Sequence, residues 1–279
     1  MRAILTLTRL TLHEAARRRV LMAAAICGGA YLLLFAIGLH FVVKQMPAKV
    51  LADVVRYRGM LIVLTLAGLY ATNFLTIMTS VLLPVDTLSG EIASGVAQTV
   101  ASKPIRRSEI VLGKWLGFVL LALGYLGALA GGVLGIGRLI GHVTPPDVPI
   151  ALGLMALEAV LFVSLSIAGG ARFSTITNGV VAFGFFGLAF VGNWVEQIGA
   201  YAGNDTARDV GTVASLIWPS ESLWQLAAWH MQPAVMRQLQ LGGPFSPASV
   251  PSPAMVWWAG GYAVALVLSA IAAFRKRGL

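Results

Sequence analysis

The hydrophobic and polar positions divide the chain into six long apolar stretches that are separated by more polar segments. Each stretch carries at most one charged residue, and an α-helix needs about 20 apolar residues to cross the hydrocarbon core of a bilayer. Strands of a membrane barrel would alternate apolar and polar side chains, whereas these stretches are apolar on every side. The pattern therefore predicts an all-α polytopic membrane protein with six transmembrane helices. They cover residues 20–43, 60–85, 115–137, 148–170, 176–195 and 254–274.

The composition agrees with a protein that resides in lipid. Hydrophobic residues make up 58% and charged residues 11% of the 279 positions, whereas soluble domains are about 45–50% apolar and about 25% charged. We therefore expect residues 1–279 to form a single transmembrane domain. The one cysteine, Cys27, lies inside the first apolar stretch, so the sequence offers no disulfide framework and no thiol metal site.

The distribution of basic residues predicts how the chain is oriented. The formal net charge is +9, but Lys and Arg gather at the ends of the apolar stretches, which indicates membrane topology rather than nucleic-acid binding. With a cytoplasmic N-terminus, 13 of the 20 Lys and Arg residues lie on the cytoplasmic side and 7 on the other. Cytoplasmic loops are enriched in these residues. We expect a multi-pass protein of the bacterial inner membrane with both termini in the cytoplasm.

The first 19 residues form a basic amphipathic segment ahead of the first span. Polar and basic side chains recur there at steps of three and four, with apolar residues, mostly leucines, between them; they are Arg2, Thr6, Arg9, His13 and Arg17. This spacing predicts a helix that lies in the membrane interface with its arginines toward lipid headgroups. The alternative is a basic flank of the first span with no helix of its own.

Two hydrophilic segments separate the spans, 86–114 on the predicted cytoplasmic side and 196–253 on the external side. In the first, a short helix over about 89–101 is expected to end before Pro104, which cannot continue it. In the second, tryptophans and apolar residues between 216 and 229 predict amphipathic helices or re-entrant turns at the outer membrane surface. The part around 242–253 is expected to be a disordered loop.

Three groups of residues resemble the pattern of a known family. Asp86, Glu91, Gly95, Pro104 and Arg107, followed by Gly113-Lys114, match that family's segment between spans two and three. Arg9, Glu14 and Arg17–Arg19 stand where the family has an interfacial elbow helix, and Trp218-Pro219-Ser220-Glu221-Ser222-Leu223-Trp224 is similar to its Pro-Ser element before the last span. Together they resemble the ABC type-2 permeases, specifically the six-span branch that includes the nitrous-oxide-reductase maturation permease and efflux permeases.

The resemblance implies a membrane-spanning permease subunit that exports or flips a substrate by alternating access. It implies a cytoplasmic coupling helix near 91–101 that sits in a cleft of a separate ABC ATPase subunit, which binds ATP and Mg²⁺. Two permeases, as a homodimer or a pair of sister subunits, would assemble with two ATPases. The implied elbow residues are Arg9, Glu14, Arg17 and Arg18, and the implied coupling residues are Asp86, Glu91, Gly95, Pro104, Arg106 and Arg107. The alternative for the second group is a set of solvated loop charges.

This chain is not expected to bind ATP itself. A phosphate-binding loop requires Gly-x-x-x-x-Gly-Lys-Ser/Thr, so that backbone amides and the Lys surround the phosphates while the hydroxyl holds Mg²⁺. Here Gly113-Lys114 is followed by Trp115 and lacks the earlier glycine. Signatures of zinc proteases, serine hydrolases and thiol redox sites are also missing from the sequence. We therefore expect a subunit with no catalytic residues, no metal and no cofactor of its own.

A polar face on the second span stands out within the apolar stretches. Thr65, Thr72, Thr76 and Thr79 recur at steps of seven, four and three, and Asn73 lies beside them. Such a face is typical of a subunit seam or a solute path, and the alternative is ordinary helix packing. Asn178 in the fifth span belongs to the same candidate set. In the third span, a ridge of Gly127, Gly131 and Gly135 predicts close helix packing.

Glu158 is the ionisable residue deep in the fourth span. An intramembrane carboxylate costs a few kcal/mol unless it is paired, neutralised or solvated, so Glu158 is either a cation or proton site or a packing partner for polar groups on neighbouring helices. An ion relay would need a second carboxylate or histidine at matching depth, and the sequence offers for this only His40, near the outer end of the first span. Two rival functions follow: an ion-coupled secondary transporter that uses Glu158, and a mechanotransmitter that acts on a periplasmic partner through residues 196–253.

Overall fold

The computed structural model describes residues 2–47, 50, 53–93, 106–239 and 249–276. Within these ranges the protein is all helical and has no strands, and six helices are long and apolar enough to span a membrane. The predicted fold class is therefore confirmed. The spans are α2 (Arg19–Lys44), α4 (Val54–Leu82), α7 (Arg107–Gly141), α8 (Val148–Gly170), α9 (Thr175–Ala202) and α13 (Ala254–Lys276).

Several spans are longer than their apolar stretches. Helix α4 begins at Val54 instead of 60, because the Asp53 side chain caps it by accepting from the amides of Val55 and Arg56. Helix α7 begins at Arg107 instead of 115, so the last part of the predicted hydrophilic segment 86–114 belongs to the third span. The predicted spans end at the first charged residues, whereas the helices continue beyond them into the polar interface.

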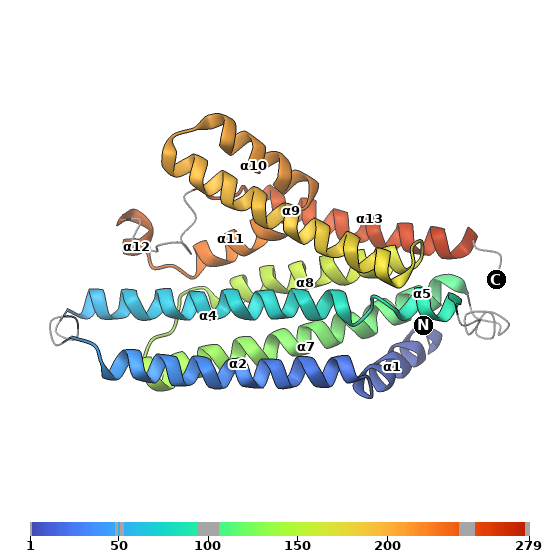
Figure 1. Cartoon of the computed structure of the whole chain (residues 1–279), viewed down its shortest axis with the longest axis horizontal. Coiled ribbons are helices and arrows are strands. Elements are labelled where there is room, and N and C mark those ends of the chain that lie inside the picture. Colours follow the sequence, from blue (N-terminus) through green and yellow to red (C-terminus); the bar gives the residue numbers. More distant parts are fainter. Residues whose placement is uncertain (1, 48–49, 51–52, 94–105, 240–248, 277–279) are drawn as a thin grey trace.

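The helices form an elongated bundle around α8 (Figure 1). Helix α8 is the most deeply buried span and packs against α4, α7, α9 and α13, whereas α2 at the outside is the least buried. The N-terminal helix α1 (Arg2–Ala16), the short helix α5 (Thr87–Ala93) and the end of α13 all lie at one end of the bundle (Figure 1). The opposite end carries the short helix α12 (Ala234–Leu239).

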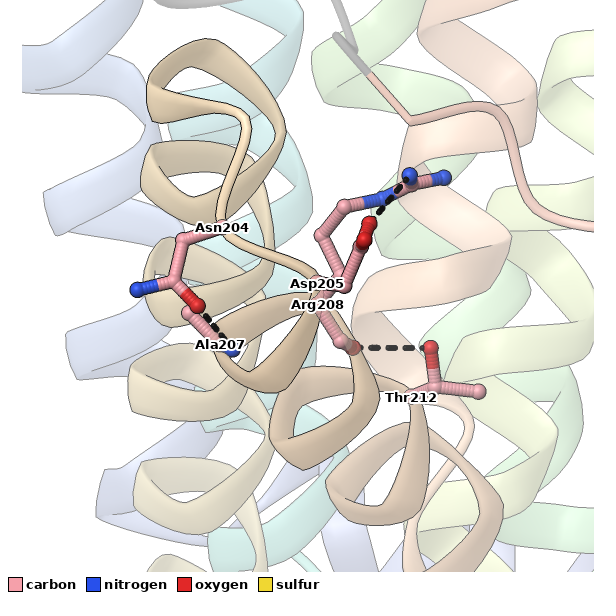
Figure 2. Close-up of polar contacts among 5 residues, drawn as sticks. All are labelled: Asn204, Asp205, Ala207, Arg208 and Thr212. Carbon is pink, nitrogen blue, oxygen red and sulfur yellow. Dashed lines mark hydrogen bonds and ion pairs between the residues drawn. The ribbon is translucent and has the colours of Figure 1, made fainter.

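Helices α9 and α10 (Asp205–Ile217) form a hairpin that tilts away from the bundle (Figure 1). Gly203 has a φ of +64°, which suits glycine and lets the chain reverse directly after α9. Figure 2 shows the start of α10, where Asn204 Oδ1 accepts from the Ala207 amide at 3.2 Å and Arg208 pairs with Asp205 at 3.5 Å. The turn is therefore fixed by a glycine and a side-chain cap.

The Trp-rich segment folds into helices, and its central tryptophans are buried in the protein. Helix α11 (Ser220–His230) is packed against α8, and Trp218 and Trp224 are buried. The Trp218 ring contacts Phe162, Phe185 and Tyr262. The predicted short helices are therefore present, and α11 turns Trp218 and Trp224 into the protein core by packing among the spans; whether the segment dips into the outer leaflet stays a prediction.

The predicted glycine ridge of α7 is also placed differently from expectation. A Cβ atom at Gly127, Gly131 or Gly135 would meet nothing within 4 Å in the described part of the subunit. Close packing of α7 occurs at other glycines, among them Gly113 at its start, where a Cβ would be 2.5 Å from Leu7 Cβ and 3.2 Å from the Ile4 carbonyl. Helix α1 rests on this glycine, and its Thr8 hydroxyl donates to the Gly113 carbonyl at 3.1 Å.

A methyl group at Gly113 is expected to push α1 away from α7. Because the obstructing atom is a Cβ and not the end of a flexible side chain, Gly113→Ala should lower the free energy of unfolding by about 1–3 kcal/mol, as overpacking does elsewhere. Thermal unfolding of the purified protein in detergent measures this. Gly131→Ala in the same helix is the matched control and should leave stability nearly unchanged; equal effects of the two variants would contradict the assigned packing of α1.

Candidate functional site

The short helix α5 is tied at its base to the first turn of α9. The Thr175 hydroxyl donates to Asp86 Oδ1 at 2.7 Å, and the Ser89 and Thr175 hydroxyls are 2.8 Å apart, within hydrogen-bond distance. Asp86 precedes α5 directly, Ser89 lies in it, and Thr175 is the first residue of α9. A displacement of α5 therefore acts on the fifth span as well as on α4, which leads into it.

The buried amide of Asn178 extends this connection to α8. Its Nδ2 donates both hydrogens to backbone carbonyls, at 3.1 Å to Val85 beyond the end of α4 and at 2.8 Å to Ser166 in α8. Asn178 is 1% exposed, so these bonds form in a non-aqueous environment. The amide fits because Gly169 of α8 lacks a Cβ, which would collide with Asn178 Oδ1. We call Asp86, Ser89, Ser166, Thr175 and Asn178 the α5 junction.

The other predicted coupling residues are not all placed at this junction. Glu91 belongs to α5, whereas Gly95 and Pro104 lie outside the described residues. Arg106 precedes α7 and is exposed, with its amide donating to Glu109 Oε2 at 3.1 Å. Arg107 Nη1 donates to the carbonyls of Phe274 and Arg275, at 3.5 and 3.2 Å, and so holds the end of α13 against the start of α7.

The predicted elbow residues lie together on α1 and the turn that follows it. Arg9, Glu14 and Arg17 are exposed and line a shallow depression on the outer side of this helix. Arg18 Nη2 forms an ion pair with Glu14 Oε1 at 2.5 Å. Exposed ion pairs contribute little to stability, so this pair mainly orients the bend between α1 and α2.

The polar face of α4 is directed into the subunit. Thr65, Thr72, Asn73, Thr76 and Thr79 are all at most 5% exposed, and α4 packs there against α7 and α8. Three of the threonines donate to carbonyls one turn earlier in α4. The sequence left open a subunit seam, a solute path or packing; the structure places the face between helices of one subunit, and a role in a path stays a prediction.

Glu158 is fully buried and is bound by α4. Asn73 Nδ2 donates to Glu158 Oε2 at 2.8 Å, which connects the polar face of α4 to the carboxyl group on α8. His40, the partner group considered from the sequence, is exposed on α2.

The second carboxyl group comes from a residue that sequence reasoning missed. Glu221, in the first turn of α11, is 3% exposed and lies within electrostatic range of Glu158. Asn193 Nδ2 of α9 donates to Glu221 Oε2 at 3.2 Å, and Gln225 Nε2 donates to Asn193 Oδ1. The sequence pattern assigns Glu221 to the predicted external segment 196–253. The signal for a helix at this point is the Ser-Glu pair directly after Trp218-Pro219, which is typical of a helix start.

Burial raises the pKa of Glu221 to about 7, and the hydrogen bond from Asn193 opposes this rise only in part. Glu221 therefore changes its charge near neutral pH. Among the residues that the structure describes, no group of three or more His, Cys, Asp or Glu side chains is arranged to hold a metal ion.

Comparison with known protein families identifies a family for this chain. The model of a family described as ABC-2 family transporter protein matches residues 55–214, more than half of the chain. The matched range runs from the first turn of α4 into α10 and contains the α5 junction, Asn73 and Glu158. Glu221 lies just beyond it. No curated protein matches the chain.

Glu221 should make the stability of the protein depend on pH. Its folded-state pKa of about 7 exceeds the ordinary value of 4.5, so folding favours the protonated form: this stabilisation is fully present below about pH 4.5 and is lost as the pH rises through 7. At one pKa unit per 1.36 kcal/mol, the loss is about 3 kcal/mol.

Glu221→Gln keeps the shape but not the charge, so it should flatten the pH dependence of the melting temperature and exceed the wild type in stability at pH 8. Thermal unfolding in detergent between pH 5 and 8 measures both proteins. Glu14→Gln, at an exposed carboxylate, is the control and should follow the wild type. If the melting temperature of the wild type did not change with pH, or rose with pH in parallel with that of Glu221→Gln, the raised pKa of a buried Glu221 would be contradicted.

Proposed function

The chain belongs to the ABC-2 family of transporter membrane proteins and is a non-catalytic permease component; from this we propose that it moves a substrate outward by ATP-driven alternating access. Permeases of this kind generally pair with an ATPase subunit. In the proposal, the ATPase binds ATP and Mg²⁺, and its closure is transmitted mechanically to the spans.

The α5 junction is the observation that carries this proposal. Helix α5 is a short rod at the end of the bundle, directly after α4 (Figure 1). Its base is bound to α9 through Asp86, Ser89 and Thr175, and the adjoining end of α4 is bound to α8 and α9 through Asn178. A partner that pushes α5 would therefore move spans two and five together, as the proposed reorientation requires.

The same end of the molecule supports the proposed orientation. Arg106, Arg107, Arg172 and the Arg275–Lys276 pair lie at the ends of α7, α8 and α13 near α5, and the arginines of α1 accompany them (Figure 1). An excess of basic residues is typical of the cytoplasmic side. We place both termini and α5 in the cytoplasm of a bacterial cell, with the spans in its inner membrane.

A second copy of the chain completes the proposed transporter. Helix α2 presents a largely exposed apolar surface, and the glycine ridge of α7 has no neighbour in the described part of the subunit. Both surfaces suit lipid or another permease, and the pairing of two permeases follows from the resemblance in sequence. On the same resemblance we assign the chain to the six-span branch that includes the nitrous-oxide-reductase maturation permease.

The α9–α10 hairpin favours a second candidate function, action on a periplasmic partner. The hairpin tilts away from the bundle, and Val210, Val213, Leu216 and Ile217 are exposed on α10 (Figure 1). An exposed apolar surface of this kind suits a protein or the lipid surface. In this alternative, the ATPase would drive the hairpin against its partner instead of moving a substrate.

Breaking the link between α5 and α9 should uncouple the permease from its ATPase. Thr175→Val removes the hydroxyl that binds Asp86 and Ser89. A lost hydrogen bond of about 1 kcal/mol corresponds to about a fivefold change in a two-state equilibrium, so the permease-dependent stimulation of ATP turnover should fall several-fold. The measurement is ATP hydrolysis by the reconstituted permease–ATPase complex.

Thr177→Val is the matched control for that experiment. Thr177 is exposed in the same turn of α9, and its hydroxyl lies 2.9 Å from that of Ser174, the residue that caps this helix. The ATPase should co-purify with the wild type and with both variants. Full stimulation in the Thr175→Val complex would contradict transmission through the junction.

A further inference from the structure

A cluster of polar side chains lies where α4, α8, α9 and α11 meet, away from the α5 junction. Glu158, Asn73, Glu221 and Gln225 are all at most 5% exposed. Tyr70 of α4 lies within electrostatic range of both glutamates. We call this set the Glu158–Glu221 cluster; its members are Tyr70, Asn73, Glu158, Asn193, Glu221 and Gln225.

The hydrogen bonds of the cluster leave acceptors without donors. Asn73 Nδ2 donates to Glu158 Oε2. The second carboxyl oxygen, Glu158 Oε1, and the amide oxygen of Asn73 are both buried without a hydrogen-bond partner. Gln225 Oε1 is also buried without a hydrogen-bond partner. An ionised carboxylate and an amide oxygen can only accept, so with Glu158 ionised neither of them can satisfy the other.

A single hydrogen on Glu158 Oε1 resolves the deficit of the Asn73–Glu158 pair. A protonated carboxyl group donates through one oxygen and accepts through the other, which matches an amide that donates through Nδ2 and accepts through Oδ1. An unsatisfied buried acceptor costs about 1–3 kcal/mol, so the proton removes two such costs at once.

The charges around Glu158 favour the same state. In the described part of the chain, no ion pair includes Glu158 or Glu221. The titratable groups that act on Glu158 from the packed helices are Glu221 of α11 and Tyr70 of α4, and neither supplies a positive charge. Two ionised carboxylates without a cationic partner in a buried region would be unfavourable both through desolvation and through repulsion.

We propose that Glu158 and Glu221 form a proton-binding site inside the permease, in which the resting protein carries a proton on Glu158 Oε1 that is donated to Asn73 Oδ1. Because Asn73 is on α4, Glu158 on α8 and Glu221 on α11, a movement of α4 against α8 would separate donor from acceptor and change the affinity of the site for protons. The proton site does not depend on α5 contacting an ATPase.

Dicyclohexylcarbodiimide, which reacts with protonated carboxyl groups in apolar surroundings, is the probe for this site. The wild-type permease at neutral pH should become labelled at Glu158, as located by mass spectrometry, and infrared spectra should contain the C=O band of a carboxylic acid. Glu158→Gln should remove the label at that position and that part of the band. Absence of both signals in the wild type would overturn the proposal, and this comparison needs no variant.

Stability separates a proton from a bound cation at the same site. Glu158→Gln offers Asn73 the same donor and acceptor as a protonated carboxyl group, so its melting temperature should stay near that of the wild type, whereas Glu158→Ala should lower it. Addition of Na⁺ or K⁺ should change neither the labelling nor the stability. Protection from labelling by either ion, or a loss of stability in Glu158→Gln as large as in Glu158→Ala, would show that Glu158 acts as an ionised carboxylate and not as a proton carrier.

Discussion

The buried amide of Asn178 holds together the end of the bundle on which the proposed coupling depends. In a membrane protein a backbone carbonyl that has lost its helical partner finds no water, so a side chain must supply the missing donor. Asn178 does this for Val85, where α4 ends, and it reaches Ser166 of α8 with its other hydrogen. The chain can turn from a span into α5 because this donor is available, and the turn is thereby fixed to α8 and α9.

The same requirement organises the interior of the bundle. Thr65, Thr76 and Thr79 of α4 donate to carbonyls of their own helix, whereas the Asn73 side chain bonds across to Glu158 of α8. Helix α11 then closes the space between the spans and brings Glu221 into range of Glu158. One end of the permease is thus connected mechanically by the hydrogen bonds of the α5 junction, and its interior contains the buried carboxyl groups of Glu158 and Glu221.

The features that depend on burying apolar helices in lipid could be predicted from the sequence. The spans, the all-helical class and the family are confirmed, because long uncharged stretches and the residues after the second span are local signals. The tertiary features were not predictable in this way. Trp218 and Glu221 look like residues of an external segment, and only the packing of α11 against α8 shows that they are buried. Asn178 was a candidate from its polarity alone, whereas its partners are 12 and 93 positions away in the chain. The functional roles of Gly95 and Pro104 stay predictions.

The central claim is that the base of α5 and the start of α9 move as one body, and a rescue by cross-linking tests it most directly. Asp86→Cys and Thr175→Cys are combined, and this pair of substitutions removes the hydrogen bond that joins the two positions. Cys27 is replaced by Ala in the same chain, so that the two new thiols are the only ones. ATP-driven transport by the reconstituted complex is then measured before and after treatment with a short bifunctional thiol reagent. Transport should be weak before treatment and should return once the covalent bridge has formed. A bridge that forms but leaves transport weak, or abolishes what remains, would mean that α5 and α9 must move relative to each other.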